Sequence, residues 1–179
     1  MINRNQATEA FYAYVQNYDA TDPMIRAKID HTFRVAKIAQ RVAQGVPCPE
    51  LSDFAWFLGL LHDIGRFEQI RRFGTYDDNR SVDHAELGAD ILFRDGLIEE
   101  FQTKALPEDF RKTAETAIRL HNKLSLPEHF PDGCMDGTET LCRILRDADK
   151  LDIFRLISEI PRTEAGKINY GLLHEKAFS

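Results

Sequence analysis

The residues most able to do chemistry are histidines and aspartates that interrupt apolar helical patterns. His62 and Asp63 stand side by side at the end of an apolar run, in the segment GLLHDIGRFEQ at 59–69. Imidazole nitrogens and carboxylate oxygens are ligands that transition-metal ions accept in proteins. A buried carboxylate is rarely left without a cation, so Asp63 at the end of a core-facing segment favours a metal site.

Four histidines fall on the apolar faces of four different expected helices. Positions i, i+4, i+7 and i+11 share one face of a helix, and on that spacing these histidines have mostly apolar neighbours. They are His31, His62, His84 and His121. An unsatisfied buried polar group costs about 1–3 kcal/mol, and one shared metal site would satisfy all four imidazoles. A single histidine of this kind is more often an ordinary core residue, so the argument depends on their number.

An acidic cluster comes late in the chain, in the segment LRDADKLDIF at 145–154. Asp149 shares a helical face with Leu145, and Asp147 shares another face with Ile144. Both faces are apolar enough to point into a core, because residues at helical spacing lie on one side of the helix. Periodicity therefore leaves Asp147 and Asp149 as equal candidates for a further metal ligand.

The elements that must position these residues are all helices, since no segment shows the strict alternation of a half-buried strand. An aspartate followed by Pro23 starts one helix, and Asp83 is the expected N-cap of another. Segments rich in proline, glycine or mixed charge, at 66–82 and 123–133, are expected to be loops. The expected helices cover about 2–19, 23–44, 51–65, 84–94, 108–122 and 137–160. The sequence predicts an all-α, single-domain helical bundle over residues 1–179, with no assignment for the polar tail at 162–179.

Composition and charge limit the classes of function. The 179 residues are 43% hydrophobic and 29% charged, which is typical of a globular domain. The net charge of −6 argues against a nucleic acid polymer or an anionic membrane as the main partner. The longest apolar run, at 54–61, is far shorter than the roughly 20 residues that cross a bilayer. Three cysteines without a C-x-x-C pair, and a start without an apolar signal segment, lead us to expect a cytoplasmic protein.

The order of these residues resembles the HD-domain superfamily of metal-dependent phosphohydrolases. His31 comes first, the pair in LLHDIGR follows, and an aspartate in ADKLD comes last. The resemblance spans about residues 25–155 and implies an all-helical bundle of the HD-domain type. The ligands that it implies for a first metal ion are His31, His62, Asp63 and Asp149. Asp147 remains the fallback for the last position.

Two more histidines extend the resemblance to members that bind two metal ions. His84 in DHAELGADIL and His121 in RLHNK fall between the HD pair and the last aspartate. The resemblance implies that both bind a second ion, with Asp63 bridging the two. The chain departs from the cyclic-di-GMP branch, because Asn122 follows His121 in place of another histidine and HFPDG replaces the GYP motif. Hydrolysis of cyclic-di-GMP is therefore not expected.

The implied activity is hydrolysis of a phosphate ester at one or two divalent ions. Such ions neutralise phosphoryl charge and lower the pKa of bound water from 15.7 to about 7. Mixed imidazole and carboxylate ligands suit Mn, Fe, Co, Ni or Zn. The expected substrate is a small phosphorylated molecule, with nucleotides among the candidates.

Cationic side chains near the HD pair are candidates for binding the substrate phosphate. Arg66 falls where relatives often have a lysine after HDIG, so Arg66 joins Asp63 as an expected catalytic residue. The expected substrate-binding residues are Arg66, Arg80 and Lys123. A competing interpretation is that three arginines of the loop only pair with acidic neighbours; they are Arg71, Arg72 and Arg80, and the acids are Glu68, Asp77 and Asp78.

Two other functions stay open on the same residues. Some proteins with this fold resemble mixed-valence diiron oxygenases, and six nitrogen and oxygen ligands would also suit iron. A non-catalytic nucleotide sensor that keeps the fold is less expected, because every ligand position of the pattern is filled.

Overall fold

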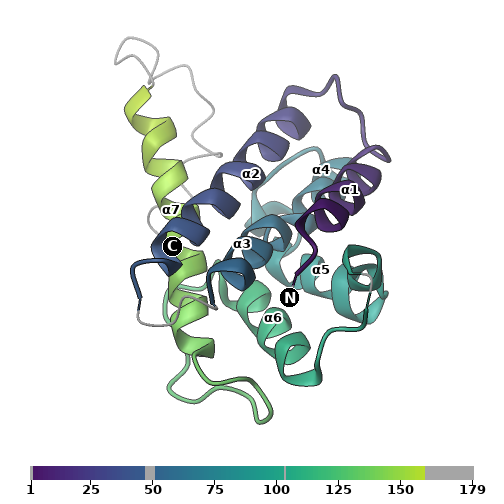
Figure 1. Cartoon of the computed structure of the whole chain (residues 1–179). Coiled ribbons are helices and arrows are strands. Elements are labelled where there is room, and N and C mark those ends of the chain that lie inside the picture. The colour runs from purple at the N-terminus through teal and green to yellow at the C-terminus, as the bar shows by residue number, and fades with distance from the viewer. Residues whose placement is uncertain (1, 47–50, 103, 160–179) are drawn as a thin grey trace.

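The computed structural model describes residues 2–46, 51–102 and 104–159 of the chain (Figure 1). These residues form helices joined by turns and loops, and none of them lies in a strand, which confirms the all-α class. In this described part of the chain, no helix combines the length and the apolar character that crossing a bilayer requires. The tail at 162–179 lies outside the described residues, as does Cys48.

Helix α2 (Pro23–Ala43) is the central element, and α3 (Leu51–Leu61) and α7 (Thr138–Glu159) pack against it (Figure 1). As expected, Asp22 caps α2, and its side chain accepts a hydrogen bond from the backbone N–H of Met24. Gly59 lets α3 approach α2 closely, because a Cβ at this position would lie 2.6 Å from the Cα of Ala36. The close approach holds the end of α3 beside the middle of α2.

Helix α1 (Arg4–Val15) covers one side of this core, and α6 (Glu108–Leu120) lies against α3 and α7. The fully buried ring of Phe11 packs edge-to-face against Phe33 of α2 and against Phe67 of α4 (Ile64–Phe73). Such aromatic pairs add about 0.5–1.5 kcal/mol beyond the area that they bury. The apolar core therefore ties the N-terminal helix to the segment that follows the HD pair.

The predicted loop at 66–82 is wrong in its first half, because α4 (Ile64–Phe73) is a helix. The chain leaves α3 at Leu61, turns at His62 and Asp63, and starts again at Ile64, so the expected continuous helix to residue 65 is also wrong. Charged residues on the exposed side of α4 hid its period, although Phe67 and Ile70 are buried. The helix ends at Gly74, whose φ of 63° lies in the left-handed region that favours glycine.

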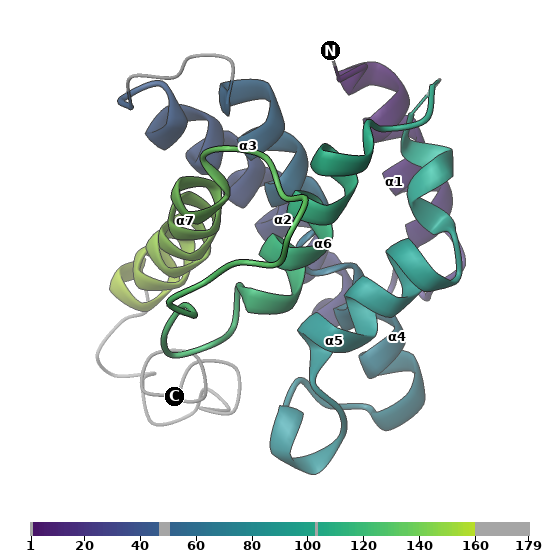
Figure 2. The same ribbon diagram turned by 90° about the horizontal axis from the view of Figure 1, so that it is seen from below.

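Helix α5 (His84–Ala89) begins at the expected cap, since Asp83 accepts hydrogen bonds from the backbone N–H groups of Ala85 and Glu86. A π-helical turn, Asp90–Arg94, continues it to the predicted end. Figure 2 shows α4 and α5 side by side. Gly65 makes this contact close, because a Cβ there would lie 2.2 Å from the carbonyl oxygen of His84. The start of α5 is thus fixed directly against the segment that carries Asp63.

Candidate metal centre

The structure brings the six predicted metal ligands together in the interior of the bundle. Each is at most 4% exposed, and they come from helices or helix ends that are distant in sequence. They are His31, His62, Asp63, His84, His121 and Asp149. Three overlapping sets of three have ligand atoms within 4.8 Å of one another. Below, the first group means His31, His62 and Asp149, and the second group means His84 and His121.

Asp63 lies between the two groups and faces both. It occupies the turn between α3 and α4, and its side chain makes no hydrogen bond that caps α4. Its Oδ2 atom lies 3.5 Å from His31 Nε2 and 3.4 Å from His62 Nε2. Its Oδ1 atom lies 3.6 Å from His84 Nε2 and 3.7 Å from His121 Nε2. The break in the helix therefore turns one carboxylate toward four imidazoles.

Two of the histidines are oriented by their own helices. His62 Nδ1 lies 2.8 Å from the carbonyl oxygen of Gly59, and His121 Nδ1 lies 2.7 Å from that of Ile118. A carbonyl oxygen only accepts hydrogen bonds, so in each ring Nδ1 carries the proton and donates it. The other nitrogen, Nε2, then presents a lone pair toward Asp63 when the imidazole is neutral.

The other two histidines are oriented by carboxylates. His31 Nδ1 lies 2.7 Å from Asp152 Oδ2, and His84 Nδ1 lies 2.6 Å from Asp78 Oδ2. A carboxylate that accepts a proton from Nδ1 fixes the tautomer and raises the basicity of Nε2 as a metal ligand. All four histidines thus direct Nε2 into the same space.

This arrangement fits metal ions because it gathers electron pairs that need a cation. His84 Nε2 and His121 Nε2 lie 3.0 Å apart, and His31 Nε2 lies 3.0 Å from Asp149 Oδ1. With protons on Nδ1, these lone pairs face one another or a carboxylate, so each contact needs a proton or a metal ion between the atoms. Within the described residues, His62 Nε2 has no hydrogen-bond partner. Mixed nitrogen and oxygen donors of this kind suit Mn, Fe, Co, Ni or Zn.

The pKa of the His62 imidazole also shows that the surrounding carboxylates favour a positive charge here. Burial opposes protonation of this ring, but the Asp63 and Asp149 carboxylates outweigh it and raise the pKa of His62 to about 9. A neighbouring anion favours the charged form of an imidazole. The carboxylates therefore stabilise a cation at the position of the His62 ring.

The structure distinguishes the two candidate aspartates of α7 by their burial. Asp149 is 3% exposed, and its Oδ1 lies 3.7 Å from His62 Nε2, whereas Asp147 is exposed on the other side of α7. Asp152, three residues after Asp149, is fully buried. Burial opposes its ionisation, yet hydrogen bonds from His31, Arg34 and Arg155 hold the pKa of Asp152 well below its usual range. The i,i+3 spacing of Asp149 and Asp152 was a signal in the sequence that both could face the centre.

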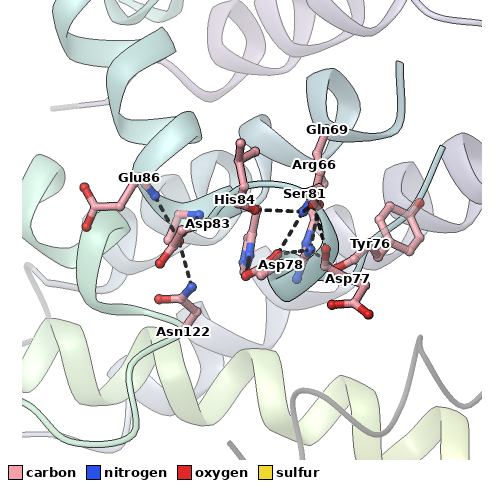
Figure 3. Close-up of polar contacts among 12 residues, drawn as sticks. Arg66, Gln69, Tyr76, Asp77, Asp78, Ser81, Asp83, His84, Glu86 and Asn122 are labelled. Atoms are coloured by element: carbon pink, nitrogen blue, oxygen red, sulfur yellow. Dashed lines mark hydrogen bonds and ion pairs between the residues drawn. The ribbon is translucent and has the colours of Figure 1, made fainter. Parts of the chain in front are cut away.

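Arg66 lies beside the centre, in the network that Figure 3 shows. Its Nη1 atom donates to Asp78 Oδ1 at 2.7 Å, to the carbonyl oxygen of Tyr76 and to Gln69 Oε1. Gln69 Nε2 also donates to Asp78 Oδ1. The structure thus shows Arg66 holding the carboxylate that orients His84, while its contact with substrate stays a prediction.

The other two predicted substrate-binding residues lie nearer the surface. Arg80 is exposed in the short 3₁₀ helix Asp78–Arg80. Lys123 Nζ lies 2.5 Å from Asp83 Oδ2. Burial opposes ionisation of Asp83, but the hydrogen bond from Lys123 outweighs it and lowers the pKa of that carboxyl group. The roles of Arg80 and Lys123 in substrate binding stay predictions.

Two of the three loop arginines pair with an acidic neighbour, as the competing interpretation expects. Arg71 and Arg72 both form ion pairs with Glu68, which is buried in α4. Both arginines are exposed, so such pairs contribute little to stability.

One lysine of the centre was missed by sequence reasoning. Lys28 Nζ lies 2.6 Å from Asp63 Oδ2, although the two residues are 35 positions apart. A lysine on a helix of mixed charge does not by itself indicate such a contact. Its position three residues before His31, on the same helical face, was the available hint.

Comparison with known proteins agrees with this geometry. A family model described as HD domain matches residues 29–153, which is more than half of the chain and contains all six candidate ligands. No curated protein and no solved structure gives a significant match.

Proposed function

This chain belongs to the HD-domain family, and we propose that it is a metal-dependent phosphohydrolase that cleaves a phosphate ester of a small molecule. Members of the family are generally metal-dependent hydrolases. The observation that carries the proposal is the convergence of four imidazole Nε2 atoms on the two oxygens of one buried carboxylate, Asp63. Such a donor set suits two ions that share Asp63.

The family resemblance assigns the first group to one ion and the second group to the other. Asp63, whose two oxygens face the two groups, would serve both ions. Bound divalent ions neutralise phosphoryl charge and lower the pKa of water to about 7 in favourable cases. These are the two obstacles to hydrolysis of a phosphate ester, since its anionic oxygens repel a nucleophile and neutral water is a weak one.

The chain itself contributes preorganisation. Asp152 and Asp78 hold the rings of His31 and His84 through their Nδ1 protons, so the ligand nitrogens need little rearrangement. The centre is also buried, which strengthens electrostatic interactions within it. A small phosphorylated molecule, with nucleotides among the candidates, is the substrate class that a centre of this kind would serve.

The proposal is tested by phosphate release. Chelator-stripped protein is loaded in turn with Mn, Fe, Co, Ni or Zn and assayed against phosphomonoesters and nucleotides. We expect release with at least one metal, and its loss in Asp63→Ala assayed in parallel. No release from any substrate with any of these metals, from protein whose metal content is confirmed, would contradict the proposal.

A diiron oxygenase is the second candidate, because the same six nitrogen and oxygen donors would suit two irons. One set of measurements on the metal-loaded protein distinguishes the two functions. Two bound irons, turnover that depends on oxygen and no release of phosphate would favour the oxygenase. Nucleotide binding without any turnover would instead favour a sensor.

A further inference from the structure

Lys28 is the cation that contacts the shared carboxylate most closely. Its Nζ lies 2.6 Å from Asp63 Oδ2, and its side chain is 12% exposed while that of Asp63 is fully buried. Lys28, a residue of α2, therefore reaches the buried carboxylate from a more exposed position. The imidazole nitrogens of His31 and His62 lie 3.5 Å and 3.4 Å from the same oxygen. The ammonium group thus shares Asp63 Oδ2 with the nitrogens that would hold the first ion.

A second contact holds Lys28 independently of Asp63. Its Nζ lies 5.3 Å from the centroid of the Tyr76 ring, a distance at which an ammonium ion is attracted to an aromatic face. The ring is 5% exposed, and its hydroxyl group donates to the carbonyl oxygen of Met24. The aromatic contact would hold the ammonium group near the centre when Asp63 binds another cation.

We propose that Lys28 binds a phosphate oxygen of the substrate once Asp63 holds metal. This inference rests on the proposed function. An ion held by Asp63 would take over much of the negative charge that Lys28 neutralises. Because an ammonium group has three N–H donors, Lys28 would then have a hydrogen bond to offer a phosphate oxygen at the edge of the centre. Lysine is a common phosphate ligand as a point charge.

The other cations near the centre are less suited to this role. Arg66 is 4% exposed, and its Nη1 already donates to three acceptors, one of them the Asp78 carboxylate. Lys123 contacts Asp83 at the N-terminus of α5 rather than Asp63. Arg80 is exposed in the short helix beyond Asp78. Among these cations, only Lys28 combines partial exposure with direct contact to the bridging carboxylate.

The test compares Lys28→Met with Lys28→Arg, which keeps the charge, and with Lys37→Met, which changes an exposed lysine of the same helix. Inorganic phosphate is titrated calorimetrically into each metal-loaded protein. A hydrogen bond to a charged group accounts for about tenfold to a hundredfold in affinity. We expect Lys28→Met to bind phosphate more weakly by that factor, Lys28→Arg to recover most of the loss, and Lys37→Met to match the wild type.

Metal affinity of the stripped proteins is the second readout. Because Lys28→Met removes a cation that competes for Asp63 Oδ2, its metal affinity should equal or exceed that of the wild type. Weaker metal binding in both Lys28 variants would overturn the inference, since Lys28 would then only support Asp63. Unchanged phosphate affinity in folded, metal-loaded Lys28→Met would overturn it as well. Failure of the wild type to hydrolyse any ester would contradict the proposed function alone, because phosphate binding is measured without turnover.

Discussion

The two groups of ligands on either side of Asp63 orient their histidines in the same way but differ in charge. In each group, one imidazole donates to a backbone carbonyl three residues earlier and the other donates to a carboxylate. Only the first group contains a carboxylate that faces the ligand space, that of Asp149. The second group depends on Asp63 Oδ1 for its negative charge. We therefore expect an ion at the first group to bind more tightly than an ion at the second.

The carboxylates that orient His31 and His84 also differ in how deeply they are buried. Asp152, behind His31, is fully buried and accepts hydrogen bonds from Arg34 and Arg155. The side chain of Asp78, behind His84, is 27% exposed. A partly exposed carboxylate is screened by solvent and holds its partner less firmly. The carboxylate behind the first group is thus the more buried of the two. Similar histidine geometry therefore need not give equal metal affinity.

The largest effect is expected from Asp63→Ala, which removes the residue common to both groups. This variant should lose most bound metal and essentially all hydrolysis, while its circular dichroism stays close to that of the wild type. The reason is that the two Asp63 oxygens lie 3.4–3.7 Å from the Nε2 atoms of both groups. Near-normal turnover with metal still bound would show that neither group depends on Asp63.

A smaller effect, confined to the first group, is expected from Asp149→Asn. The change removes a charge but keeps the shape, so the affinity of the first ion should fall by about tenfold or more, since even changes behind the ligands cost 10–100-fold. Asp147→Asn is the matched control, because Asp147 is exposed on the same helix. Its metal affinity should stay within a few-fold of the wild type. Titration of stripped protein compares the two, and greater damage from Asp147→Asn would show that the other face of α7 binds metal.

The smallest effects are expected from the carboxylates behind the histidines. Asp152→Asn and Asp78→Asn should each weaken the binding of one ion by about tenfold, the low end of the range for such residues. Asp152→Asn should affect the tighter ion and Asp78→Asn the weaker one, because their partners, His31 and His84, belong to different groups. Two resolved binding steps in the titration curve would report this. Equal loss of both steps in both variants would remove the distinction between the groups.

The features that the sequence predicts well are those with a strong local signal. The burial of His31, His62, His84 and His121 follows from apolar neighbours at helical spacing, and the all-α class follows from the same periodicity. The cap at Asp22 and the cap at Asp83 are also where residue types predict them.

The features that were missed depend on contacts between distant segments. Helix α4 was assigned to a loop because its charged residues on the exposed side hide the buried Phe67 and Ile70. Periodicity alone left Asp147 and Asp149 tied, because each has apolar neighbours, and the family resemblance favoured Asp149. The packing of α7 against α2 buries Asp149 and leaves Asp147 exposed. The contacts of Lys28 with Asp63 and of Asp78 with His84 join different elements, and no local pattern encodes them.

The central claim is that the two groups hold two metal ions across Asp63, and metal stoichiometry tests it most directly. Chelator-stripped protein is titrated with the metal that supports activity, and bound metal is then counted by elemental analysis. We expect about two ions in the wild type and about one in each of His84→Ala and His121→Ala, with the tighter ion retained. A single ion in the saturated wild type, or loss of both ions from each variant, would contradict the account.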